Sequence, residues 1–333
     1  MAAERVPAAA TQRHRTRILR PLREVEPAAT LPRAARGAEA PAAEGGTVPS
    51  SLGRRMVEAA RLVHPFPSLL DGTVVGVVAS VAGAEPGRAL LLAASMVFLQ
   101  FSIGTLNDLV DAPRDAATKP GKPIPDGVVG ESGARVVLVL SAGAGLAAAL
   151  ASGPLTLLLA IVTLAIGAWY DLGANRSRLS WLPLALGVPV LPVYGWLGAT
   201  GGLPPAFAVL VPASALAGAA LAIANAAVDI ERDAATAKAS LAVALGPVRS
   251  TALVLALQAT VAATAVASGS RLGAPGPWLD VATAVALIPV AGALLGLVAS
   301  RRGPAAREVA FELQAIGLGL LVVAWVNALS AAA

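Results

Sequence analysis

The chain has 333 residues, of which 56% are hydrophobic and 14% are charged. The charged fraction is well below the roughly 25% of ordinary soluble domains, which indicates a polytopic membrane protein. No cysteine and two histidines are present, which excludes disulfides and thiolate metal sites and leaves little material for histidine-dependent nucleophilic catalysis. The net charge of +5 comes from Lys and Arg in loops between apolar runs, so we expect it to set membrane topology and not to bind nucleic acid.

Residues 1–52 differ in composition from the rest of the chain. They are rich in Ala, Arg, Pro and Glu, and they contain no apolar run long enough for the core of a signal peptide. A segment of this composition does not bury enough apolar surface to fold by itself. We therefore predict a disordered cytoplasmic tail over 1–52, without a catalytic role, followed by one membrane domain over 53–333.

The membrane domain contains nine apolar segments, each close to the length that crosses a bilayer as a helix. Several are rich in Gly and Ala, whose small side chains let helices approach one another closely in lipid. The predicted fold is therefore all-α, a polytopic membrane bundle of nine transmembrane helices. The predicted spans are 66–84, 88–109, 134–152, 154–170, 181–199, 205–228, 248–268, 279–299 and 309–329.

The basic residues of this domain are divided unequally between the two sides of the predicted bundle. Counted over alternate loops, one side receives only Arg88 and Arg271. Because Lys and Arg are concentrated in cytoplasmic loops, the other side is predicted to face the cytoplasm. We expect a multi-pass protein of the cell membrane with a cytoplasmic N-terminus. The basic residues of the predicted cytoplasmic side are Arg54, Arg55, Arg61, Arg114, Lys119, Lys122, Arg135, Arg176, Arg178, Arg232, Lys238, Arg249, Arg301, Arg302 and Arg307.

An acidic pattern occurs twice, each time at the end of an apolar run. Segments 107–115 and 225–233, here called the first and second motifs, both read Asn-x-x-x-Asp-x-x-x-Asp. On a helix this spacing aims one amide and two carboxylates in the same direction. Carboxylates at membrane depth are costly and usually functional, and carboxylate oxygens suit Mg²⁺, which often bridges protein acids to substrate phosphates. A purely structural pairing with neighbouring basic residues is the alternative, and two copies with the same spacing favour diphosphate chemistry.

A basic loop follows each motif. Lys119 and Lys122 come after the first motif, and Lys238 comes after the second. Ammonium groups beside the acids would neutralise the charge that grows on a departing diphosphate. Both motifs follow even-numbered spans, so both are expected on the cytoplasmic side.

The two motifs resemble the signatures of the UbiA superfamily of intramembrane prenyltransferases. The first motif with the loop to Gly127 is similar to the first signature of that family, and the second motif with the segment to Gly246 is similar to its second. The resemblance covers about residues 60–330. It implies transfer of a prenyl group from an isoprenyl diphosphate, with Mg²⁺ as cofactor, to an aromatic ring or another acceptor.

The resemblance also implies roles for individual residues. Those implied to bind Mg²⁺ are Asp108, Asp111, Asp115, Asp229 and Asp233. Those implied to contact the ions or the diphosphate during catalysis are Asn107, Asn225, Lys119, Lys122 and Lys238.

The chain departs from the family pattern at two places. Ala237 stands where a glycine is usual in the second signature. The middle motif, residues 170–176, has Asn175 at the position of the usual lysine and adds Asp171. Because this middle loop commonly lies near the acceptor or the diphosphate, these changes leave the acceptor open.

Four further residues are candidates for substrate binding. Arg61 either reaches the diphosphate or serves topology, and Asp71, as a lone acid in an apolar span, is expected to face the interior toward the acceptor or a metal-bound water. Tyr170 either stabilises a carbocation through its ring face or belongs to the interfacial aromatic belt. Asp171 either orients a polar acceptor or pairs with a nearby arginine, while His64 is interpreted as marking the start of a helix.

The function predicted from the sequence is Mg²⁺-dependent prenyl transfer through an allyl cation to an aromatic or other lipophilic acceptor. An alternative is a terpene cyclase of the same superfamily that uses the same ionisation, and a remote alternative is an ion-coupled transporter. The expected partners are an isoprenyl diphosphate, a small-molecule acceptor and the lipid bilayer, with no nucleic acid. Phosphosugar, quinone-ring, tetrapyrrole and glycerophosphate acceptors, the prenyl length and the oligomeric state remain open.

Overall fold

The computed structural model describes residues 52–118, 121–236, 238–271, 273 and 275–330. The predicted tail therefore lies outside the described residues except for its last residue, and so does Lys119. Within the described ranges all regular structure is helical, which confirms the predicted all-α class. Eight helices there are long and apolar enough to cross a membrane, and a ninth span results if α2 is joined to the helix before it.

The long helices follow the predicted spans closely. They are α2 (Pro65–Val81), α3 (Pro86–Thr118), α4 (Glu131–Ser152), α5 (Pro154–Leu172), the consecutive pair α6 (Leu182–Gly187) and α7 (Val190–Thr200), α8 (Phe207–Val228), α11 (Pro247–Arg271), α12 (Gly276–Ala299) and α13 (Pro304–Ser330). Three short helices lie outside the spans, namely α1 (Leu52–Ala60), α9 (Ile230–Ala235) and α10 (Leu241–Leu245).

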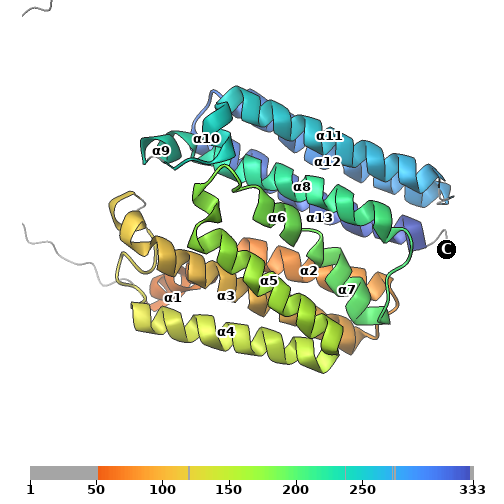
Figure 1. Ribbon diagram of the computed structural model, residues 1–333, viewed down its shortest axis with the longest axis horizontal. Coiled ribbons are helices and arrows are strands. Elements are labelled where there is room, and N and C mark those ends of the chain that lie inside the picture. Colours follow the sequence, from red (N-terminus) through yellow and green to blue (C-terminus); the bar gives the residue numbers. More distant parts are fainter. Residues whose placement is uncertain (1–51, 119–120, 237, 272, 274, 331–333) are drawn as a thin grey trace, which may run out of the picture. The chain divides into compact units, whose positions relative to one another are not determined.

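The helices of the membrane domain form two groups that close on each other. In the first group α3 packs against α2, α4 and α5, and in the second α11 packs against α8 and α12, which in turn packs on α13 (Figure 1). Contacts of α2 with α13 and of α6 with α8 join the groups. The helices that meet at these junctions enclose the interior of the bundle.

Small residues allow these junctions to be close. Gly218 of α8 faces the carbonyl oxygen of Leu184 in α6, and a Cβ at this glycine would collide with that oxygen. Ala217, Ala220 and Ala224 of α8 are buried on neighbouring turns. Outward-facing leucines and valines remain exposed on the other faces of the helices, as expected for surfaces that contact lipid.

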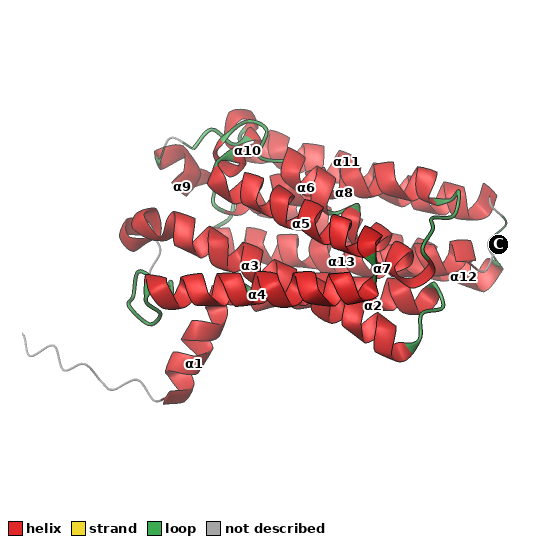
Figure 2. Cartoon of the chain, turned by 60° about the horizontal axis from the view of Figure 1, so that its bottom comes forward, coloured by secondary structure: helices red, strands yellow, loops and turns green. Residues whose placement is uncertain are grey.

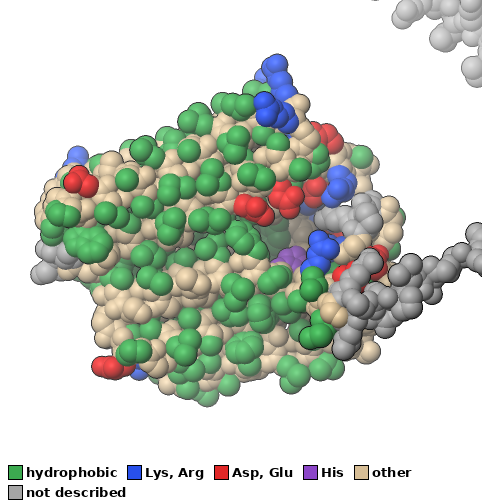
Figure 3. Space-filling view, turned by 180° about the vertical axis from the view of Figure 1, so that it is seen from behind, with side chains coloured by type: hydrophobic (Ala, Val, Ile, Leu, Met, Phe, Trp, Pro, Cys, Tyr) green, Lys and Arg blue, Asp and Glu red, His purple; other side chains and the backbone are tan. Residues whose placement is uncertain are grey.

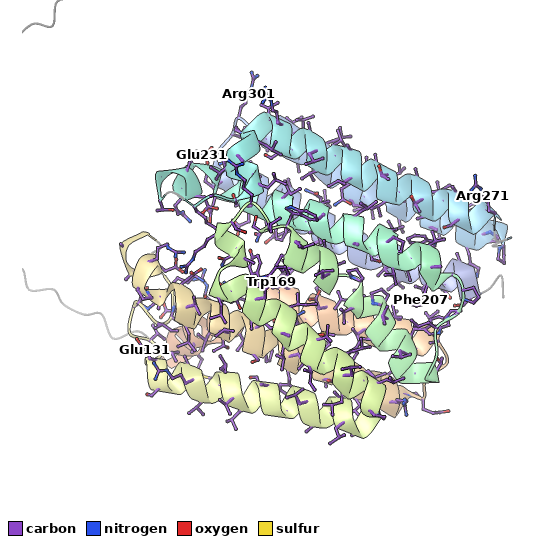
Figure 4. The ribbon with its side chains drawn as sticks, in the orientation of Figure 1. Glu131, Trp169, Phe207, Glu231, Arg271 and Arg301 are labelled. Carbon is purple, nitrogen blue, oxygen red and sulfur yellow. The ribbon has the colours of Figure 1, made fainter. Side chains whose placement is uncertain are left out.

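Both acidic motifs lie at one end of the bundle, which we call the motif end. The C-terminal part of α3 and the helices α9 and α10 are found there, and α1 leaves the bundle from the same end (Figure 2). Figure 4 places Glu131, Glu231 and Arg301 at the motif end and Arg271 at the opposite end. The basic loops are thus divided between the two ends as the sequence predicts.

Three helix boundaries differ from the predicted ones. The second span was expected to end at residue 109, but α3 continues through Pro113 to Thr118, so the whole first motif is helical. The second motif is broken instead, because α8 ends at Val228 and Asp229 adopts a non-helical conformation before α9. Asp favours this position because its side chain competes with helical hydrogen bonding. The span predicted over 181–199 is also divided, because α6 ends at Gly187 and α7 begins at Val190, directly after Pro189.

Candidate active site

Asp108 is the most enclosed acid of the first motif. Its side chain is 3% exposed, and its Oδ1 atom accepts from Lys122 Nζ at 2.5 Å and from His64 Nε2 at 3.0 Å. Its Oδ2 atom is buried without a hydrogen-bond partner. Lys122 also lies 3.9 Å from Asp115. One lysine therefore serves two motif acids, and one buried carboxylate oxygen remains available to a ligand.

His64 reaches Asp108 because the chain bends in front of α2. Its backbone has φ 48° and ψ 64°, the left-handed region that non-glycine residues seldom occupy. Pro65 begins α2, and the helical segments on the two sides of His64 meet at 54°. Gly104 of α3 makes room for the imidazole, since a Cβ there would lie 3.1 Å from that of His64. The sequence predicts His64 to mark the start of a helix and does not indicate its contact with the motif.

The remaining residues of the first motif are connected to the middle loop. Asn107 Nδ2 donates to Asp171 Oδ1 at 3.0 Å. Asp111 accepts from Arg114 at 3.1 Å and from Arg176 at 3.3 Å. Asp171 is 1% exposed and does not line the cavity described below. The sequence predicts that Asp171 either orients a polar acceptor or pairs with a nearby arginine, and in the structure its carboxyl group accepts a hydrogen bond from Asn107.

The second motif is held in a similar way. Asp229 pairs with Arg232 at 3.0 Å, and Asp233 pairs with Lys238 at 3.1 Å. The carbonyl oxygen of Arg176 accepts from the backbone N–H of Ala239 at 3.2 Å. Arg176 therefore contacts the first motif through its side chain and the loop behind the second motif through its backbone.

The donor chemistry of the motifs fits a hard divalent cation. Within the described ranges no three acidic or histidine side chains converge on one point, and the motif acids pair with lysines, arginines or His64. The unpartnered buried Oδ2 of Asp108 is an oxygen that such an ion would satisfy.

A cavity of about 460 Å³ opens at the motif end and continues between the two helix groups. His64, Tyr170 and Asn225 line its mouth. Figure 3 shows a hollow at this end with acidic and basic side chains around it and a histidine at its edge. Of the four predicted substrate-binding residues, Asp71 and Tyr170 line this cavity.

The deeper part of the cavity is apolar. Leu210, Val261 and Trp325 line it far from the motifs, and Trp325 is held by a 2.9 Å hydrogen bond from its indole N–H to Ser268. Asn225 and Leu210 lie at opposite ends of the lined part of α8, and fifteen residues of helix correspond to about 22 Å. The cavity is long enough to hold an extended apolar chain whose polar head stays at the motif end.

Arg61 does not line the cavity. Its guanidinium lies beside Gly121, 3.7 Å from the position that a Cβ would take there, in the loop that follows the first motif. Gln100 of α3, in contrast, lines the cavity and contacts Asp71, although the sequence analysis did not single it out. In the sequence, Gln100 is recognisable as a single amide side chain inside an otherwise apolar run.

A match to a protein-family model tests the relationship that the motifs suggest. The model described as the UbiA prenyltransferase family matches residues 69–316. The chain belongs to the UbiA prenyltransferase family. The match includes both motifs, the middle loop and most of the cavity wall, so the resemblance inferred from the motifs is confirmed.

Solved structures show that the fold is shared with other UbiA proteins. A UbiA homologue from Aeropyrum pernix K1 matches with a TM-score of 0.61 at 21% identity, over 77% of this chain and 97% of that chain. A UbiA homologue from Archaeoglobus fulgidus bound to GPP and Mg²⁺ matches with a TM-score of 0.61 at 18% identity, over 80% of this chain and 99% of that chain. A digeranylgeranylglyceryl phosphate synthase matches with a TM-score of 0.62 at 16% identity, over 83% of this chain and 98% of that chain. No curated protein matches the sequence of this UbiA-family chain significantly.

Proposed function

We propose that this protein is a Mg²⁺-dependent prenyltransferase that moves a prenyl group from an isoprenyl diphosphate to a lipophilic acceptor within the membrane. The observation that carries the proposal is the position of two acid motifs, each with a lysine partner, at the mouth of a long apolar cavity. Membership of the UbiA prenyltransferase family supports it, as does the Archaeoglobus fulgidus homologue bound to GPP and Mg²⁺.

The diphosphate is proposed to bind at the motif end. Mg²⁺ bound by the motif acids would neutralise charge on the diphosphate oxygens. Lys122 and Lys238 each contact a motif acid, so their ammonium groups lie within reach of a phosphate held there. Lys119 keeps its predicted role in the same loop, and we propose that Arg61, beside Gly121, contacts the diphosphate from the other side. The motif acids proposed as ion ligands are Asp108, Asp111, Asp115, Asp229 and Asp233.

The cavity is proposed to hold the prenyl chain and to protect the allyl cation. Its apolar walls exclude water, which would otherwise capture the cation as an alcohol. Tyr170 lines the mouth, and its ring would stabilise the positive charge that develops there. Asp171 acts indirectly, because it orients Asn107.

Transfer to an acceptor is preferred over cyclisation because the cavity wall is not wholly apolar. Asp71 and Gln100 contact each other within it, and such a polar pair can hydrogen bond to a polar acceptor. The basic loops gather at the motif end, so we also propose that the active site faces the cytoplasm.

The test is diphosphate release by purified protein in lipid nanodiscs. Radiolabelled geranyl, farnesyl and geranylgeranyl diphosphates are supplied with Mg²⁺ or with EDTA. We expect Mg²⁺-dependent release that falls about 100-fold or more in Asp108→Asn and in Asp233→Asn. Glu131→Gln is the matched control, since Glu131 is an exposed acid at the same end that pairs with Arg135. No release from any donor by the wild-type protein would refute the proposal.

A further inference from the structure

Asp71 and Gln100 form a polar pair inside the cavity. Asp71 belongs to α2 and Gln100 to α3, and both side chains line the cavity wall. Gln100 Nε2 donates to Asp71 Oδ2 at 2.7 Å. No described residue hydrogen bonds to the other oxygen, Oδ1. The amide thus fixes the carboxyl group and leaves one acceptor atom for a ligand.

The pair is separate from the acidic motifs. Gln100 precedes Asn107 by seven residues on the same helix, which corresponds to about 10 Å along α3. A group bound to Asp71 therefore lies deeper than the diphosphate, at a distance that a molecule of the size of one aromatic ring can span. Because the cavity is continuous between these points, such a molecule would reach the carbon that the diphosphate leaves.

The wall of the cavity is poor in partners for an anion. Among the described residues that line it, none is a lysine or an arginine, and the one histidine, His64, contacts Asp108. The nearby cations at the motif end, Lys122 and Lys238, are paired with motif acids. An unpaired carboxylate or phosphate moved from water into this space would lose its hydration without gaining a counter-ion. The electrostatics of the cavity thus disfavour an acidic acceptor.

Building on the proposed prenyl transfer, we infer that Asp71 and Gln100 are the acceptor subsite and select an uncharged, hydroxyl-bearing acceptor over one that carries a carboxylate or a phosphate. In this arrangement the acceptor hydroxyl donates its hydrogen bond to Asp71 Oδ1. Gln100 is a positioning residue, because it acts on the acceptor through the orientation of Asp71. The inference narrows the acceptors left open by the sequence to neutral hydroxyl compounds.

The experiment uses two probes of nearly equal shape and different charge. 4-Hydroxybenzyl alcohol is neutral, and 4-hydroxybenzoate carries a carboxylate at the same position. Binding of each probe to the full-length protein in nanodiscs is measured with Mg²⁺ and geranylgeranyl diphosphate present, and prenylated product is quantified in parallel. We expect the wild-type protein to bind the neutral probe at least tenfold more tightly than the acid.

Variants assign this selectivity to the pair. Asp71→Asn should weaken binding of the neutral probe by about 10- to 100-fold, as expected when a buried hydroxyl donor is left without its acceptor, and should reduce the difference in affinity between the two probes. Gln100→Met should raise the KM of the neutral acceptor with a smaller effect on kcat. Thr163→Val is the control, because Thr163 also lines the cavity but donates its hydroxyl to Leu159 at 2.8 Å.

Failure of this inference is distinguishable from failure of the proposed function. Acceptor-independent, Mg²⁺-dependent diphosphate release by the wild-type protein tests the donor chemistry alone. If release occurs and the acid binds as well as the alcohol, if neither probe binds, or if Asp71→Asn leaves the selectivity unchanged, the acceptor inference is overturned. Prenylation of the acid at a rate equal to that of the alcohol would overturn it as well.

Discussion

Lys122 is the lysine that lies beside two acids of the first motif. It lies 2.5 Å from Asp108 and 3.9 Å from Asp115, and its side chain is 23% exposed. The ammonium group therefore stays close to both acids. A positive charge fixed in this position would stabilise a departing diphosphate without further reorganisation.

We predict that Lys122→Met lowers the rate of diphosphate release by about 100- to 1,000-fold, because the developing negative charge loses a preorganised partner. Lys122→Arg should retain part of the rate, since it keeps the charge but changes its geometry. Single-turnover release with saturating donor measures the effect. Arg135→Met, which removes an exposed cation at the motif end, serves as the control, and an equal loss in that variant would contradict a specific role for Lys122.

The sequence identifies the motif acids more readily than it identifies the residues that contact them. The repeat of Asn and Asp at intervals of four residues predicts that each motif points its side chains in one direction, whatever surrounds it. The contact between His64 and Asp108 spans 44 residues and depends on a left-handed backbone conformation, neither of which local patterns specify. The contact of Asp171 with Asn107 is equally long-range.

The short helix α9 carries the end of the second motif and is connected to α13 by an ion pair. Glu231 of α9 accepts from Arg307 of α13 at 3.0 Å and 2.5 Å. The Arg307 side chain is 3% exposed, whereas that of Glu231 is 66% exposed. The hydrogen bonds from Arg307 lower the pKa of Glu231 below its usual value. The pair anchors α9 on a buried arginine.

We predict that Glu231→Gln destabilises the protein by about 1 kcal/mol at pH 7, a value reduced from that of a buried pair because the glutamate is exposed. A carboxyl whose folded-state pKa is lowered contributes stability above its unfolded pKa of about 4.3 and loses it as the pH falls through the folded value. The difference between wild type and variant should therefore shrink as the pH falls below about 4. Thermal unfolding in detergent at several pH values measures it, and a difference that grows on acidification would contradict the assignment.

Helix boundaries show where local sequence rules stop being sufficient. Apolar length predicts the spans well, because a helix that crosses lipid must hide its backbone over a fixed distance. It does not predict that α3 continues through Pro113, because this part of α3 lies beyond the apolar run, at the polar end of the bundle. Apolar length also does not predict the break at Asp229 between α8 and α9.

The orientation of the whole molecule is a prediction that the chain makes easy to test. It has no cysteine, so a single introduced cysteine is the sole thiol. Ser132 is exposed at the start of α4, at the motif end, and Ser270 is exposed at the end of α11, at the opposite end. With a membrane-impermeant maleimide, we expect Ser270→Cys to be labelled in intact cells and Ser132→Cys only after permeabilisation. The reverse pattern would place the active site outside.

The length of the cavity predicts which donors the protein uses. Trp325 lines the deep part of the cavity and is 2% exposed, so it limits the space available to the end of a prenyl chain. We predict that Trp325→Leu raises the ratio of kcat/KM for a longer donor to that for a shorter one by about tenfold, since one extra methylene in an apolar pocket changes discrimination by about 10- to 200-fold. Competition between geranylgeranyl and farnesyl diphosphates measures the ratio. Trp278→Leu, which alters a 40% exposed tryptophan on α12 outside the cavity, should leave the preference unchanged, and an equal shift in both variants would show that Trp325 does not set chain length.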